Sequence, residues 1–175
     1  WSGALGVWTV NVSTGLSKPI LGSTNIAQMD LNSINFSEAA GTIVLTIEDT
    51  GFGPLPGQDI GGVLLTNRIG GTTQGEISTA GTLTAGGNSY MVENNNGLPM
   101  GPGAFSDTAS INIAPFAVAF DLKEVVTIVH ASSGNTSFDK ELTAAVPEPA
   151  TMLLSGLGLL GLGVYLRRRR RSKKA

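Results

Sequence analysis

The side chains that could carry acid–base or metal chemistry are few in this sequence. His130 is the only histidine, and the chain has no cysteine. Thiol catalysis and zinc sites built from several Cys and His ligands are therefore excluded. Any imidazole base or metal ligand would have to be His130. It ends an alternating apolar segment, on the face of Val126 and Ile128, so we expect a partly buried histidine at a strand end.

Carboxylates could support two other kinds of chemistry. Glu48 and Asp49 stand together at the end of an alternating segment, where a carboxylate pair could hydrolyse a glycoside or oxygen ligands could hold Ca²⁺. The remaining candidates are scattered, at Asp59, Asp107, Asp121 and Asp139. Their spacing is not that of a calcium loop, so we interpret them as solvated charges at strand ends. We predict no catalytic residue, no metal ligand and no cofactor.

Two aromatic side chains are candidates for stacking against sugar rings. Phe52 and Tyr90 both lie next to segments rich in turn residues, where a ring could stay accessible. Trp8 alternates with Val10 and Val12, and we expect it in the core instead. Phe52 and Tyr90 are therefore the predicted contacts if the protein binds carbohydrate.

The sequence pattern predicts that short β-strands position these side chains. Residues 43–47 alternate apolar and polar side chains, and residues 125–131 and 137–144 form later strands. Gly- and Pro-rich segments separate the strands, with loops expected at residues 51–57 and 94–103. No part of the body has a helical period over three turns. We predict an all-β domain over residues 1–146, an antiparallel β-sandwich of immunoglobulin-like or jelly-roll-like layout.

The C-terminal residues have a different composition. Residues 150–166 are 17 uncharged residues, close to the shortest length that can span a bilayer as a helix. Seven of the chain's 11 Lys and Arg residues follow directly: Arg167, Arg168, Arg169, Arg170, Arg171, Lys173 and Lys174. The positive-inside rule places this basic cluster in the cytoplasm and the body outside. Residues 150–166 are thus predicted to form one transmembrane helix, with residues 167–175 as a basic stop-transfer tail.

A short proline motif joins the body to this segment. Pro147, Glu148 and Pro149 form a stiff, extended strip immediately before the apolar run. Together, the motif, the Leu- and Gly-rich span and the Arg run resemble the PEP-CTERM sorting signal of Gram-negative bacteria. The resemblance covers residues 147–175. It implies export through the inner membrane, recognition at residues 147–149 by an exosortase-type membrane cysteine protease, removal of the tail, and an association with exopolysaccharide and biofilm.

Charge divides the chain into two unlike parts. Residues 1–146 carry four cations and twelve carboxylates, a formal charge of −8, whereas the whole chain has −2. An acidic body of this kind is repelled by nucleic acid and by anionic lipid, so we expect no nucleic-acid partner. A tail that enters the membrane from outside also needs an earlier export signal, and we expect the precursor to carry an N-terminal signal peptide ahead of Trp1.

Three functions are compatible with this sequence. The first is a non-enzymatic surface or extracellular-matrix protein that passes through the inner membrane during export. The second is a carbohydrate-binding module for exopolysaccharide, using Phe52 or Tyr90. The third is a secreted hydrolase, which the sequence supports least because no nucleophile, base and orienting group can be assembled from it.

Overall fold

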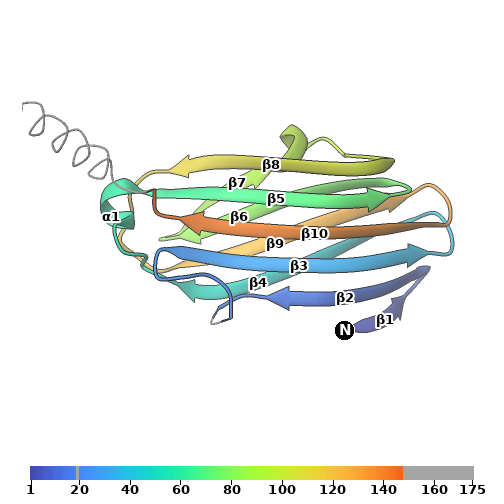
Figure 1. Cartoon of the computed structure of the whole chain (residues 1–175), viewed down its shortest axis with the longest axis horizontal. Helices are drawn as coiled ribbons and strands as arrows, with labels where there is room; N and C mark the ends of the chain where they lie inside the picture. The colour runs from blue at the N-terminus through green and yellow to red at the C-terminus, as the bar shows by residue number, and fades with distance from the viewer. Residues whose placement is uncertain (19, 148–175) are drawn as a thin grey trace, which may run out of the picture.

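A computed structural model describes residues 1–18 and 20–147 of the chain (Figure 1). Ten antiparallel strands account for most of these residues: β1 (Ser2–Leu5), β2 (Trp8–Leu16), β3 (Ile26–Ser37), β4 (Gly41–Phe52), β5 (Val63–Thr73), β6 (Glu76–Ala85), β7 (Asn88–Glu93), β8 (Gly103–Ile113), β9 (Phe120–His130) and β10 (Gly134–Ala145). They form a six-stranded sheet in the order β1-β2-β3-β10-β5-β8 and a four-stranded sheet in the order β4-β9-β6-β7.

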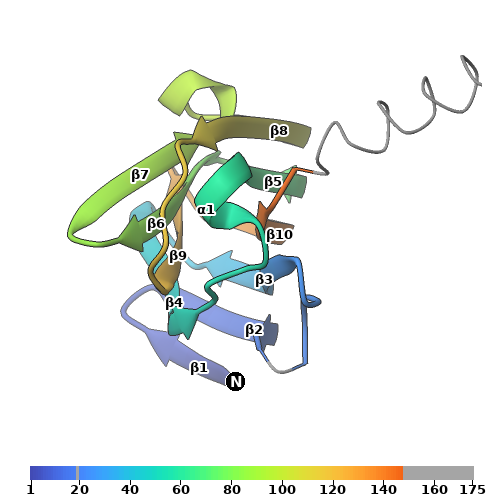
Figure 2. The same ribbon diagram turned by 90° about the vertical axis from the view of Figure 1, so that its left-hand side faces the viewer.

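The two sheets pack face to face, which confirms the predicted antiparallel sandwich (Figures 1 and 2). From β3 onward, each connection crosses from one sheet to the other, except the hairpin between β6 and β7. The central orders β3-β10-β5-β8 and β4-β9-β6-β7 are those of a jelly roll, one of the two layouts expected from the sequence. The last strand, β10, lies in the interior of its sheet, between β3 and β5.

Alternating side chains build the core between the sheets. On β4, Ile43 is buried, and Leu45 and Ile47 are partly buried against the core, as the alternation predicts. Trp8 is also buried, as expected. Both sheets contribute to each of two apolar clusters, one around Phe120 and Leu142, the other around Ile128 and Phe138.

The loops differ from the prediction in detail. Gly51 and Phe52 belong to β4, because the pairing of β4 with β9 shifts register between Asp49 and Phe52. A four-residue helix, α1 (Gln58–Gly61), follows, and a four-residue 3₁₀ helix, η1 (Asn94–Gly97), lies in the later loop. No helix among residues 1–18 and 20–147 is long and apolar enough to cross a membrane. The predicted transmembrane helix at residues 150–166 lies outside the described residues.

Candidate functional site

His130 lies between two hydroxyl groups inside the sandwich. Its Nδ1 is 2.6 Å from Ser37 Oγ, and its Nε2 is 2.8 Å from Thr136 Oγ1. Both hydroxyl residues are buried, as is the ring itself, so the histidine is more deeply enclosed than expected. Burial lowers the pKa of His130, which keeps the imidazole neutral. A buried serine–histidine contact with no carboxylate on the second ring nitrogen ties strands together and gives no accessible nucleophile.

The two adjacent carboxylates do not form a pair. Glu48 is exposed, whereas Asp49 accepts hydrogen bonds from Ser17 Oγ at 2.6 Å and Lys18 Nζ at 3.1 Å. The hydrogen bond from Ser17 is the main cause that lowers the pKa of Asp49. Successive strand residues point to opposite faces, so Glu48 and Asp49 cannot flank one substrate. Asp49 instead fixes the segment that follows β2.

Two further acidic candidates hold loops in place. Asp107 accepts the backbone N–H of Asn95 at 2.6 Å, and this bond is the main cause that lowers its pKa. Asp121 accepts the backbone N–H of Gly51 at 2.9 Å. Within the described ranges, no group of three or more His, Cys, Asp or Glu side chains could hold a metal ion.

The aromatic candidates face the interior of the sandwich. Phe52 is only 3% exposed, and its ring stacks on Phe120 with centroids 5.9 Å apart. The ammonium of Lys18 lies 4.0 Å from the centroid of Phe52, so a sugar cannot reach this ring without displacing its neighbours. Tyr90 is half-buried and packs against the core. We therefore do not retain Phe52 as a sugar-stacking residue. Because Tyr90 is half-buried, only one edge of its ring could contact a sugar.

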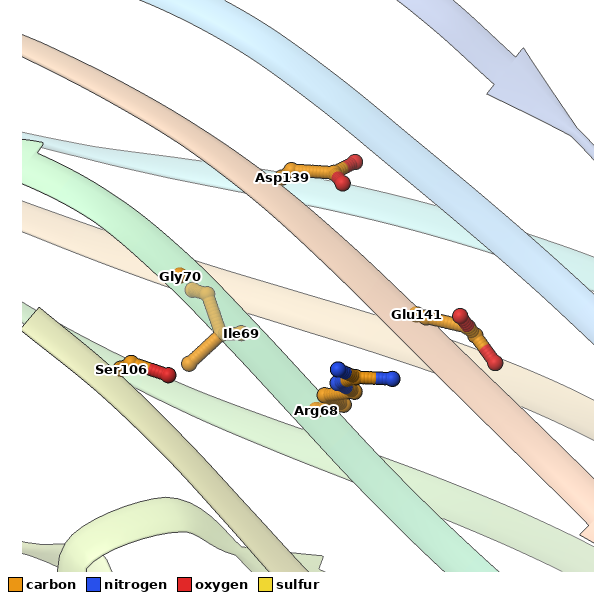
Figure 3. A pocket seen from close by; sticks show the side chains of 6 residues that line it. All are labelled: Arg68, Ile69, Gly70, Ser106, Asp139 and Glu141. Carbon is orange, nitrogen blue, oxygen red and sulfur yellow. The ribbon is translucent and has the colours of Figure 1, made fainter.

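The outer face of the six-stranded sheet carries an open depression that sequence reasoning missed (Figure 3). Its volume is about 420 Å³, and its lining residues come from three adjacent strands: Arg68, Ile69 and Gly70 of β5, Ser106 of β8, and Asp139 and Glu141 of β10. Gly70 pairs with both Asp139 and Ser106, so the absence of a side chain at this position opens the hollow between them. The next row pairs Glu141 with Arg68.

The charges around this depression are mostly negative. Glu141 pairs with Arg68 on one side and with Asp30 of β3 on the other. The pKa of Asp30 is raised, mainly because burial removes water from its carboxylate, and the negative charge of Asp139 raises it further. Arg68 is the only cation among the lining residues. A guanidinium beside carboxylates and a hydroxyl offers donors and acceptors to a polar ligand such as a sugar. The alternation in the sequence indicates which side chains of β5 and β10 point outward. It does not indicate that these two strands are neighbours in the sheet.

The predicted sorting motif begins where the sandwich ends. β10 ends at Ala145, and the N–H of Val146 donates to the carbonyl of Asn25 at 3.3 Å. Val146 still packs against the core, whereas Pro147 is exposed. This end of β10 lies beside α1, at one end of the sandwich (Figure 2). The rest of the predicted motif and tail falls outside the described residues: Glu148, Pro149, residues 150–166, Arg167, Arg168, Arg169, Arg170, Arg171, Lys173 and Lys174.

Comparison with protein families identifies a PEP-CTERM protein-sorting motif at residues 145–171. The resemblance predicted from the sequence is thereby confirmed: the chain carries a PEP-CTERM sorting signal, which indicates an exported protein. No curated protein matches this sequence.

Comparison with solved structures finds several that are similar to this chain. TmCBM61 in complex with β-1,4-galactotriose is 11% identical with a TM-score of 0.43, over 79% of this chain and 88% of that chain. The enzymatically active domain of bacteriophage CBA120 tailspike protein 4 is 10% identical with a TM-score of 0.39, over 75% and 18%. A structure of carbohydrate-binding modules from the β-sandwich superfamily is 12% identical with a TM-score of 0.34, over 82% and 57%.

Proposed function

We propose that this chain is a non-enzymatic component of the cell surface or extracellular matrix, associated with exopolysaccharide and biofilm. Its tail delivers it across the inner membrane, with the C-terminus held in the cytoplasm. An exosortase-type protease then recognises Pro147, Glu148 and Pro149 and removes residues that follow. The released product is an acidic β-sandwich.

The observation that carries this proposal is the position of the boundary. The last core contacts come from Leu142 and Ala144 of β10 and from Val146, which follows the strand, and the next residue, Pro147, is exposed. A cut at or after Pro147 therefore removes no strand and no core side chain of the sandwich. The substrate segment starts in solvent, where a protease can bind it as an extended chain.

The arrangement of polar groups favours a structural role over catalysis. His130 is enclosed between the hydroxyls of Ser37 and Thr136, and Asp49, Asp107 and Asp121 are engaged in loop hydrogen bonds. These groups hold segments together instead of facing a shared cleft.

Intact-mass analysis of protein from the producing cells and their medium tests this function. We expect the medium to contain a species that ends near Pro147. The variant Pro147→Ala should reduce its amount and retain full-length chain in the membrane. Pro56→Ala, at another exposed proline on the same end of the sandwich, is the matched control and should be processed normally. If every wild-type molecule keeps residues 167–174 and stays in the membrane, permanent anchoring replaces the sorting account.

The depression on the six-stranded sheet favours a second candidate function, binding of exopolysaccharide. Arg68 and Glu141 lie opposite each other, and Ser106 and Asp139 flank the hollow at Gly70. Binding should be measured by calorimetry with polysaccharide purified from the producing cells. Arg68→Ala should weaken it, while Lys123→Ala, an exposed cation on the opposite sheet, and Tyr90→Ala should have little effect. Equal affinities of Arg68→Ala and wild type would place any sugar site elsewhere.

A further inference from the structure

Three ionisable or amide side chains meet in the core between the sheets. Lys140, Asn67 and Glu124 each have 0% of their surface exposed. Lys140 Nζ donates a hydrogen bond to Asn67 Oδ1, and Glu124 Oε1 lies 3.6 Å from the same Nζ. An amine, a carboxamide and a carboxyl group are thus held together away from water.

The strand pairing brings these groups together. Asn67 on β5 pairs with Leu142 on the neighbouring strand β10, and Lys140 is the next inward-facing residue along β10. Glu124 reaches the pair from β9 in the opposite sheet. Phe138 and Leu142, which flank Lys140 on the same face, are both buried. The lysine therefore has no route to solvent along its own face of the strand.

As an ion pair, this arrangement is poorly satisfied. Within the described part of the chain, neither carboxylate oxygen of Glu124 has a hydrogen-bond partner. Burying two charges is costly unless their geometry is excellent and their remaining hydrogen bonds are made. Burial raises the pKa of Glu124 to about 7 and lowers the pKa of Lys140 to about 8. The two pKa values are therefore close, so a proton can move from the ammonium to the carboxylate at little cost. This transfer gives a neutral acid and a neutral lysine amine, which is a nucleophile.

We propose that Lys140 and Asn67 form an intramolecular isopeptide bond, with Glu124 as the proton-transfer residue. The neutral Nζ attacks Cγ of Asn67, and the new Nζ–Cγ bond replaces the Cγ–Nδ2 bond. Glu124 gives its proton to the departing Nδ2 and takes one from Nζ, so that one ammonia leaves and the carboxyl group ends protonated. No electron is gained or lost, and no co-reactant is needed.

Proximity is the physical basis of this reaction. A primary amide reacts very slowly with an amine in water, but fixing both groups in contact converts the reaction into an intramolecular one and avoids solvent reorganisation. The hydrogen bond from Nζ to Oδ1 already holds the amine against the amide group that it must attack. Glu124 Oε1 lies 3.6 Å from Nζ, so its carboxyl group can take the proton that the attacking amine loses. Asn67 Nδ2 donates to the carbonyl of Val92 at 3.3 Å, and it must leave that contact to receive a proton from Glu124.

The bond is tested by intact-mass analysis of the folded full-length chain. We expect a mass lower than the sequence mass by one ammonia. Trypsin should then fail to cleave after Lys140, and tandem mass spectrometry should find the peptide ending at Arg68 joined to the peptide containing Lys140. A wild-type chain at its full sequence mass, with cleavage after Lys140, overturns the proposal without any variant.

Variants assign the role of each group. Lys140→Arg should restore the sequence mass, whereas Lys123→Arg, at an exposed lysine on β9, should leave the linkage intact. Asn67→Asp should lose one water in place of ammonia and give the same final product mass as wild type. Glu124→Gln should leave most of the chain unlinked. Retention of the ammonia loss in Lys140→Arg would identify a succinimide elsewhere, and wild-type linkage in Glu124→Gln would overturn the role of Glu124.

The isopeptide bond does not depend on the sorting function. The bond would form within residues 67–140, whether or not the tail is processed. A linked chain that is never cleaved and a cleaved chain that is never linked are distinguishable by mass, because the two changes affect different peptides.

Discussion

Glu124 of β9 and Lys140 of β10 face each other across the two sheets, with Oε1 and Nζ 3.6 Å apart and neither side chain exposed. Burial raises the pKa of Glu124 from 4.5 to about 7, so between these values the folded state holds a proton that the unfolded state has released. Stability from this group therefore falls as the pH rises through that window. Lys140 does not affect this window: as an amide linked to Asn67 it does not titrate, and in an unlinked chain its lowered pKa acts above pH 8.

We expect the free energy of unfolding to decrease from pH 4.5 to 7 in wild type and to stay level in Glu124→Gln. Only the slopes with pH are compared, because the two chains also differ in the linkage. The size of the pKa shift corresponds to about 3 kcal/mol as an upper value. Urea unfolding of both chains across this range measures the difference. Glu48→Gln, at an exposed position, should follow wild type. Parallel curves for wild type and Glu124→Gln would show that the Glu124 carboxyl group has a normal pKa.

Two adjacent glycines of β5 should differ strongly in how well they tolerate alanine. A Cβ on Gly71 would lie 2.1 Å from the carbonyl oxygen of Ser137, so Gly71→Ala must push β5 away from β10. A Cβ on Gly70 would meet nothing closer than 3.8 Å. We expect Gly71→Ala to lose at least about 2 kcal/mol of stability and Gly70→Ala less than about 0.5 kcal/mol in thermal or urea unfolding.

The Gly70→Ala substitution also tests the depression. Its methyl group would enter the hollow between Asp139 and Ser106, so any polysaccharide affinity at this site should fall while stability is kept. Calorimetry with the purified polysaccharide makes this measurement. An unchanged affinity in a stable Gly70→Ala chain would argue against ligand binding in this depression.

Phe52 should behave as a core residue and not as a ligand contact. Phe52→Ala removes a ring that stacks on Phe120 and lies beneath Lys18, and we expect a loss of about 3–5 kcal/mol in the free energy of unfolding. Phe36→Ala, at a phenylalanine that is 39% exposed, is the control and should lose less than about 1 kcal/mol. A stable Phe52→Ala chain with weakened sugar binding would instead restore its predicted stacking role.

The chain should tolerate truncation at the end of the sandwich but not within β10. A chain that ends after Val146 keeps every core residue of β10. We expect its sandwich domain to have the same unfolding temperature as the sandwich domain of the full-length chain. A chain that ends after Asp139 lacks Leu142 and Ala144 and should lose at least about 3 kcal/mol. Calorimetry of both chains decides this. Equal stability of the two would place the domain boundary earlier than β10.

Much of the fold could be predicted because strand alternation is a local property. Ile43, Leu45 and Ile47 face the core as their spacing indicates. Phe52 was misplaced because the irregularity after Asp49 changes which side chains point inward, and no local pattern marks it. The depression at Gly70 could not be foreseen, since it depends on β5, β8 and β10 being neighbours.

The buried polar groups did leave a local signal. Asn67 stands between Leu65 and Ile69, and Lys140 stands between Phe138 and Leu142, each in the inward phase of its strand. A polar residue that interrupts an apolar alternation is therefore a candidate for a buried interaction. What the sequence cannot show is that the two strands adjoin and that Glu124 lies opposite them, because pairing partners are set by the whole topology.

The position of β10 has a mechanical consequence. This strand leads directly to the tail, and antiparallel partners β3 and β5 pair with it along nearly its whole length (Figure 1). A pull applied at Val146 along the strand axis is therefore opposed by both rows of hydrogen bonds at once, in shear. A terminal strand at the sheet edge would instead be held by a single row. While the protein remains tethered by its tail, any pulling force acts first on β10, a strand that is hydrogen-bonded to a neighbour on each side.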